Sequence, residues 1–323
     1  MEILEKFLCQ TLLLKDHESN FKFEKKFRNI ENNKNEFLIL LKPEILYPSV
    51  SRESEKQILK IIFELFQRNN VSVISAAVFD GVYAIENRIF RRHYSQLYRG
   101  ATGENLLYDK RFENENELVP AYSFLNDSPD YDAVRLEEES HKKGSRKIGN
   151  GTYIYDFIYN HRNISVINAF HPHQINHFEK EKNVFIVFYC QSETDYGDLA
   201  DKLIGFFRPS EAIEGSLRRI FWEKKELLGI NISTLKNGVH LSPSPLEFLK
   251  NLPLYFRGIE FSDTFFGSEL DKLAISKKFI EKLYENPYSN IYEQYVFDIA
   301  EGKDIKILLN ILKGLYEKEY FTD

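Results

Sequence analysis

The residues best suited to chemistry lie in one short segment, KNGVHLSPSP (236–245). Its histidine, His240, comes just before a helix-start signal, in which Ser244 is followed by a proline and then by Glu247. Serine at the N-cap with glutamate three residues later forms a capping box, and proline is favoured at the first helical position. The pattern therefore predicts that His240 lies in a loop leading into a helix, near its positive N-terminal end.

A histidine in that position has a plausible chemistry with phosphate. Neutral imidazole is a nucleophile toward phosphorus, and an unperturbed pKa of about 6.5 leaves most of it unprotonated at neutral pH. The N-terminus of a helix also favours phosphate groups. His240 is therefore a candidate phosphate acceptor. Taken alone, the segment fits an ordinary turn histidine better, so the rest of the chain has to decide.

The composition narrows the classes of function. Over 323 residues the formal net charge is −6, which gives no global basic field for nucleic acid. Apolar runs stay shorter than the roughly 18 residues of a membrane span, and the first residues lack the features of a signal peptide. The two cysteines, Cys9 and Cys190, are too far apart to make a disulfide framework. We therefore expect a cytoplasmic protein without a membrane partner.

The elements that must position His240 alternate between strands and helices. Apolar runs at 36–44, 71–79 and 183–190 predict buried strands. Residues 51–70 have helical apolar spacing, with a capping box predicted at Ser54 and Gln57. Helical patterning returns at 83–98. This order predicts an α/β sandwich.

The same reading divides the chain into four parts. Residues 1–35 predict an N-terminal helical extension, and 36–256 predict the main domain. The main domain is interrupted at about 99–166, where polar segments with glycine and proline predict an insertion. Residues 257–323 hold three helical patterns and predict a C-terminal helical extension.

Five segments, in order, resemble the nucleoside diphosphate kinase family, whose members pass a γ-phosphate through a phosphohistidine. They are LLKPEILYPS (40–49), HYSQLY (93–98), AFHPHQINHF (169–178), ADKLIGFFRPSEAIEGSLRR (200–219) and KNGVHLSPS (236–244). The resemblance covers roughly 36–98 and 167–256. It implies a ferredoxin-like sandwich, with an antiparallel sheet and helices on one face, decorated by the insertion and the C-terminal helices.

The resemblance also implies a role for each matching residue. These are His240 as phosphate acceptor with Ser242 in support, Lys42 and Arg218 as phosphate-binding cations, Asn237 as a contact to the sugar, Tyr94 beside the acceptor, and Phe170 as a stacking platform for the base. Mg²⁺, bound with a nucleoside triphosphate, is the implied cofactor. Each role has a structural alternative: Lys42 could end a strand, Arg218 could pair with acids, and Phe170 could belong to a core.

Three positions depart from the family pattern. Asp201 stands where the family has a phosphate-binding arginine, Phe207 where it has a threonine, and Asn251 where it has a glutamate. A carboxylate that faces phosphates weakens their binding by repulsion. Two functions therefore stay open. One is a nucleoside diphosphate kinase-like phosphotransferase, and the other is a catalytically weak or inactive nucleotide-binding or interaction module on the same fold.

Two further segments carry charged or metal-binding residue types. The basic residues of HKKGSRKIGNG (141–151), which are Lys142, Lys143, Arg146 and Lys147, could supply charge at the mouth of the site or form a solvated loop. His171, His173 and His177 lack a familiar metal spacing, so we predict no metal site there. Nucleotides are the expected partners. Family members usually assemble into hexamers or tetramers, which leaves a homo-oligomer open.

Overall fold

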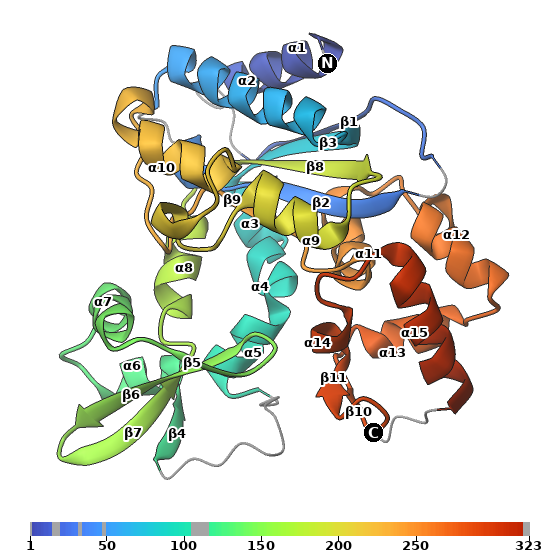
Figure 1. Ribbon diagram of the computed structural model, residues 1–323. Helices are drawn as coiled ribbons and strands as arrows, with labels where there is room; N and C mark the ends of the chain where they lie inside the picture. The colour runs from blue at the N-terminus through green and yellow to red at the C-terminus, as the bar shows by residue number, and fades with distance from the viewer. Residues whose placement is uncertain (1, 15–19, 32–33, 47–49, 105–115, 319–323) are drawn as a thin grey trace.

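The computed structural model describes residues 2–14, 20–31, 34–46, 50–104 and 116–318 (Figure 1). At its centre is a five-stranded sheet in the order β1-β3-β8-β2-β9, with every neighbouring pair antiparallel. The strands are β1 (Lys22–Lys26), β2 (Asn35–Leu41), β3 (Ser72–Asp80), β8 (Val184–Ser192) and β9 (Val239–Leu241).

The connections between these strands give a ferredoxin-like topology. β2 leads through α2 (Arg52–Arg68) to β3, and β8 leads through α10 (Leu217–Leu228) to β9. The two βαβ units interleave, because β2 lies between β8 and β9. Three short elements, α9 (Tyr196–Asp198), the π-helical turn η2 (Leu199–Ile204) and η3 (Pro209–Glu211), precede α10. The predicted ferredoxin-like fold is thus confirmed, and β1 adds an edge strand beside β3.

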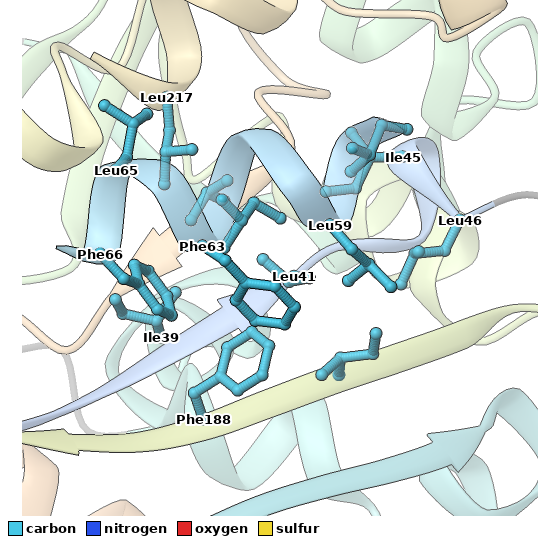
Figure 2. Packing of buried hydrophobic residues seen from close by; sticks show 14 of the residues in the cluster. Ile39, Leu41, Ile45, Leu46, Leu59, Phe63, Leu65, Phe66, Phe188 and Leu217 are labelled. Carbon is cyan, nitrogen blue, oxygen red and sulfur yellow. The ribbon is translucent and has the colours of Figure 1, made fainter. Parts of the chain in front are cut away.

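Helices α1 (Glu2–Leu14), α2 and α10 cover one face of the sheet. Figure 2 shows this packing, in which Phe63 and Phe66 of α2 meet Phe188 of β8. The ring centroids of these residues lie 6.4 and 5.5 Å from that of Phe188, both edge to face, as aromatic pairs prefer. Large aromatic side chains therefore fill the contact between α2 and the sheet on this face.

The opposite face is also covered, which corrects the expectation of helices on one face. Leu38 and Leu40 of β2 point to this face, whereas Phe37 and Ile39 point to the first. A strand that is apolar on both sides must be buried on both. The covering helices are α3 (Gly81–Glu86), α4 (Ile89–His93), α8 (His171–Phe178), α11 (Pro245–Tyr255), α12 (Phe265–Lys272) and α15 (Ile305–Lys318).

The C-terminal residues are joined to the sheet by polar contacts as well. The Glu36 carboxylate of β2 accepts the backbone N–H groups of Phe265 (3.0 Å) and Phe266 (2.8 Å), at the start of α12. Asp304, just before α15, accepts from Asn35 at 2.7 Å. The remaining elements of this region are η4 (Phe261–Asp263), α13 (Lys277–Leu283), β10 (Tyr288–Ser289), β11 (Gln294–Tyr295) and α14 (Val296–Ala300).

The residues between α4 and α8 form a second sheet, in the order β4-β7-β6-β5. Its elements are α5 (Ser95–Thr102), β4 (Glu117–Pro120), α6 (Ala121–Asp127), α7 (Ala133–Lys143), β5 (Arg146–Gly149), β6 (Thr152–Tyr159) and β7 (Arg162–Ile167). Phe124, Phe157 and Val166 form a separate small core here. Part of the predicted insertion, 105–115, lies outside the described residues, as do several residues of the predicted N-terminal extension. The described helices include none that is long and apolar enough to cross a membrane.

Candidate functional site

The residues around His240 come from five parts of the chain. We call them the His240 cluster: Lys42, Glu44, His93, Tyr94, His177, Phe178, Arg218, Asn237 and His240. Apart from Phe170 and Ser242, every residue to which the sequence analysis gave a site role belongs to this cluster. Their chemical roles remain predictions, and the contacts below show what the arrangement can do.

His240 lies in the middle of β9, directly opposite Leu40 of β2. The loop position expected for it is therefore wrong, because the residues around it pair with β2 instead of remaining free. Val239 and Leu241 pack into the core beneath α1, α2 and α10, which we call the first face of the sheet. Leu40 points to the opposite, second face. Side chains alternate along a strand, so the His240 side chain points to the second face. The pairing of β9 with β2 fixes this orientation.

Lys42 follows the end of β2, two residues beyond Leu40 and therefore on the same side of the sheet. Its Nζ donates to Asn237 Oδ1 at 2.7 Å, which joins the two predicted contacts directly. The side chain is almost fully buried. Burial lowers the pKa of Lys42 to about 8, with Glu44 opposing the shift and Arg218 adding to it.

Glu44 is a member of the cluster that the sequence analysis missed. Its carboxylate is fully buried, accepts the N–H of Gly238 at 2.8 Å, and pairs with His177 Nε2 at 3.1 Å. Burial acts to raise its pKa, but the bond from His177, the charge of Lys42 and the Gly238 N–H outweigh this and hold the pKa below its usual value. The cluster thus contains an ionised carboxylate close to its cations.

Arg218, in the first turn of α10, donates most of its hydrogen bonds to backbone carbonyls. One terminal nitrogen donates to Gly205 O and the other to Val239 O, both at 2.8 Å. The bond to Val239 O fixes the position of the residue that precedes His240. Burial lowers the pKa of Arg218 to about 10, with Tyr94 and Glu44 opposing the shift. Its Nε is buried and lacks a hydrogen-bond partner in the part of the chain that the structure describes.

Aromatic rings enclose His240 on its second-face side. The ring centroid of His93 lies 4.9 Å from that of His240, and the centroid of Tyr94 lies 5.2 Å away. Tyr94 stacks on Phe178 at 6.1 Å, and Lys42 Nζ lies 5.8 Å from the Phe178 centroid. Two aromatic rings therefore contact His240, and one of them stacks on a third ring that Lys42 approaches.

His240 is neutral in this setting. Burial, followed by the neighbouring His93, Lys42 and Arg218, places its pKa well below the usual value. The side chain nevertheless keeps some exposed surface. A neutral, partly accessible imidazole retains a lone pair that can attack an electrophile.

The cluster also holds buried hydrogen-bond donors without acceptors. Within the described residues, Tyr94 Oη and Arg218 Nε have no partner, and the same is true of one ring nitrogen of His93. Burial raises the pKa of Tyr94, so its hydroxyl keeps its proton and remains a donor. Unpaired buried polar atoms cost free energy, which makes them informative. Donors and cations around a neutral imidazole are the features of a site for an anion.

Two predicted site residues lie away from the cluster. Phe170 precedes α8 and packs on Tyr153 and Tyr155 of the second sheet, at 6.0 and 6.4 Å. The eight residues of α8 separate it from Phe178 by about 12 Å. Ser242 is buried beyond β9, where its Oγ accepts from the Leu38 N–H at 3.1 Å. It supports the strand that carries His240.

The three departures from the family pattern occupy different places. Asp201 is exposed on η2, outside the cluster. Phe207 is 46% exposed, and its backbone carbonyl accepts from Asn237 Nδ2 at 3.2 Å. Asn251 is buried on α11, and its Oδ1 has no partner among the described residues. Because Asp201 is exposed, solvent and salt would screen its expected repulsion of a bound phosphate.

The basic residues at 142–147 serve other contacts. Arg146 pairs with Asp156 of β6 at 3.4 Å, and Lys147 pairs with Asp298 and Glu301 at 3.3 Å each. These ion pairs connect the second sheet internally and to α14. They do not support the hypothesis that this segment supplies charge at His240.

The histidines of HPHQINH (171–177) likewise have separate partners. His171 contacts Gln174 at 3.3 Å, His173 lies 3.8 Å from Glu137, and His177 pairs with Glu44. Among the residues described, no group of three or more His, Cys, Asp and Glu side chains is arranged to hold a metal ion.

Comparison with known proteins gives a distant structural likeness. None of the protein-family models matches this chain, and no curated protein sequence does. Among solved structures, a transition-state mimic of nucleoside-diphosphate kinase from Borrelia burgdorferi, with bound vanadate and ADP, is similar at a TM-score of 0.34 and 15% sequence identity. The likeness covers 70% of this chain and 88% of that one. A likeness this weak does not indicate a function. The function proposed below is inferred from the geometry of the His240 cluster.

Proposed function

We propose that this protein is a phosphotransferase that takes the terminal phosphoryl group of a nucleoside triphosphate onto His240 and passes it to a second nucleotide. One observation carries the proposal. A neutral imidazole, His240, stands among buried cations and buried donors that have no acceptor among the described residues. An anionic phosphoryl group would satisfy those donors and place phosphorus next to the ring.

The chemistry follows from this arrangement. The lone pair of one His240 ring nitrogen attacks the γ-phosphorus, a P–N bond forms, and the P–O bond to the nucleoside diphosphate breaks. In the second half, an oxygen of another nucleoside diphosphate attacks phosphorus and the P–N bond breaks. Phosphoryl transfer requires positioning and neutralisation of the phosphoryl oxygens more than covalent help. Lys42, Tyr94 and Arg218 would supply those hydrogen bonds and charges.

The remaining nucleotide contacts belong to the same proposal. Asn237, which is fixed by Lys42, would reach the sugar. The base-stacking role of Phe170 has the least support, since Phe170 packs on the second sheet. Both carboxylate oxygens of Glu44 already have partners, so Mg²⁺ would be held by phosphate oxygens, and it would supply neutralisation of their charge. Assembly into a homo-oligomer and a cytoplasmic location remain predictions.

A binding module without transfer is the second candidate, and specific contacts favour it. Both terminal nitrogens of Arg218 already donate hydrogen bonds to backbone carbonyls. Glu44 places a carboxylate near the two cations. Together these reduce the positive charge available to a triphosphate, so nucleotide could bind without efficient transfer.

Labelling separates the two functions. After incubation with a γ-labelled nucleoside triphosphate and Mg²⁺, label should appear on the protein, labile in acid and stable in alkali, as expected for a P–N bond. His240→Asn should abolish the label, whereas His141→Asn, at an exposed histidine on α7, should keep it. Label that resists acid would point to a serine or threonine. Measurable nucleotide binding with no label on His240 would establish the binding module.

A further inference from the structure

His93 is one of three histidines in the cluster and has no role in the proposal above. It is the last residue of α4, is 7% exposed, and lies with its ring 4.9 Å from that of His240 at an interplanar angle of 74°. One ring nitrogen, Nδ1, is 2.8 Å from the hydroxyl oxygen of Tyr255 at the end of α11. The other, Nε2, is buried without a partner in the described part of the chain.

The contact with Tyr255 decides which nitrogen of His93 carries the proton. Burial lowers the pKa of His93 to about 3, so the ring is neutral and carries one N–H. Burial also holds the pKa of Tyr255 well above its usual value, so its hydroxyl keeps its proton. If Tyr255 donates to Nδ1, the ring proton must be on Nε2. The reverse arrangement would leave the buried Tyr255 proton without an acceptor, which costs additional free energy.

The consequence is a buried N–H donor beside His240 for which the described residues provide no acceptor. His240 makes no hydrogen bond to it, since Nε2 is unpaired. A side chain that served only packing would not need this costly unpaired donor. An anionic group bound at His240 would bring oxygen acceptors close to His93.

We infer that His93 donates its Nε2–H to the anionic group bound at His240, and that Tyr255 is the positioning residue that keeps this proton on Nε2. This inference deepens the proposed function, because the anion it describes is the phosphoryl group of that reaction. His93 contributes a neutral donor. Its hydrogen bond therefore persists at a pH where Lys42 has lost its charge.

The tautomer can be observed directly in the full-length protein. With ¹⁵N in the histidine rings, two-bond proton–nitrogen spectra distinguish the Nε2–H from the Nδ1–H form, and His93→Gln identifies the His93 signals. We expect the Nε2–H form in the unmodified protein and a mixture of forms in Tyr255→Phe. Inorganic phosphate at high millimolar concentration should move the Nε2 proton downfield. An Nδ1–H form, or an Nε2 proton that phosphate leaves unmoved, would overturn the inference.

Transfer rates give an independent readout. His93→Phe fills the space without a donor and should slow labelling of His240 by about a hundred-fold, the usual effect of losing one donor to a reacting oxyanion. His93→Gln can place an amide N–H near the position of Nε2 and should recover most of the rate. Tyr255→Phe should slow labelling by about ten-fold, as loss of an outer-sphere partner does. Equal rates in the Phe and Gln variants would contradict the assigned donor.

The inference and the proposed function fail in different ways. The spectra require no transfer, so a protein whose His93 responds to phosphate but whose His240 takes no label retains the donor and loses the phosphotransferase. A protein that labels His240 at the normal rate in His93→Phe retains the function and loses the inference.

Discussion

At the scale of single residues, the cluster balances two cations against one carboxylate. Burial lowers the pKa of both Lys42 and Arg218, and Glu44 opposes the shift for each. Buried charges are costly unless they are paired, and the pairing here is partial. An incoming anion would improve it. Of the two cations, Lys42 has the pKa closer to neutral pH, so it loses its charge first as the pH rises.

We predict that nucleotide affinity depends on pH through Lys42. Its pKa of about 8 means that it is charged below pH 8 and neutral above it, so affinity should fall as the pH rises through about 8. One charge-assisted hydrogen bond is worth about 1.5–3 kcal/mol, which corresponds to a loss of roughly ten-fold or more. Titration calorimetry with a nucleoside triphosphate from pH 7 to 9.5 measures this. Lys42→Arg keeps its charge over that range and should give a flat profile, and an equal fall in that variant would refute the assignment.

The sequence predicted some of these residues and not others. Lys42, Asn237 and His240 lie in segments that resemble a known family, so the resemblance identified them as candidates. Glu44 and His177 are 133 residues apart in the chain, and neither has a local pattern that indicates the pair. Tyr255 and His93 are likewise joined across two helices. Contacts of this kind depend on the packing of the sheet, which a single sequence does not specify.

At the scale of elements, β9 and the turn before it orient the site. Gly238 has a φ of +79° and donates its N–H to Glu44. A Cβ at this position would lie 3.1 Å from Ile45, 3.3 Å from Phe221 and 3.5 Å from Ile232. The turn therefore requires glycine both for its backbone angle and for the lack of space.

We predict that Gly238→Ala destabilises the protein more than Gly229→Ala. Both glycines have positive φ, which costs a residue with a side chain about 1–2 kcal/mol. Gly229 has open space around its Cβ position, whereas Gly238 does not, so crowding should add about 1–3 kcal/mol at Gly238 alone. Urea unfolding of the two variants gives the difference. Equal unfolding free energies would show that the turn adapts without strain.

Element prediction succeeded where local signals were strong. The helix start at Ser244 is confirmed, because its Oγ accepts the Glu247 N–H at 3.2 Å. The start predicted at Ser54 is wrong by one turn, since Ser51 caps α2 and accepts from Ser54 N. β1 was not predicted, because an edge strand pairs through its backbone and KFEKK (22–26) has little apolar pattern. The strands of the second sheet were missed among polar segments.

At the scale of the whole molecule, the sheet joins the C-terminal helices to the site. Helical patterns after 256 were visible in the sequence, but their position against the second face was not. That position follows from apolar residues on both sides of β2 and from contacts between residues far apart in the chain. The same face carries α4 and α11. Helix α4 brings His93 to His240, and α11 brings Tyr255 to His93. The C-terminal helices therefore complete the core on which the cluster is built.

Glu36 is the polar anchor of this arrangement and gives a test at the molecular scale. Its buried carboxylate accepts from Phe265 N, Phe266 N, Gln191 Nε2 and the Tyr189 hydroxyl. Glu36→Ala leaves these donors unpaired, and we expect a loss of about 2–4 kcal/mol in the free energy of unfolding. Glu31→Ala, which removes a half-exposed carboxylate paired with Lys34, should change it by less than about 1 kcal/mol. Urea unfolding measures both, and limited proteolysis should show α12 becoming accessible in Glu36→Ala first. If Glu36→Ala unfolds at the same urea concentration as Glu31→Ala, Glu36 is not the anchor of the C-terminal helices.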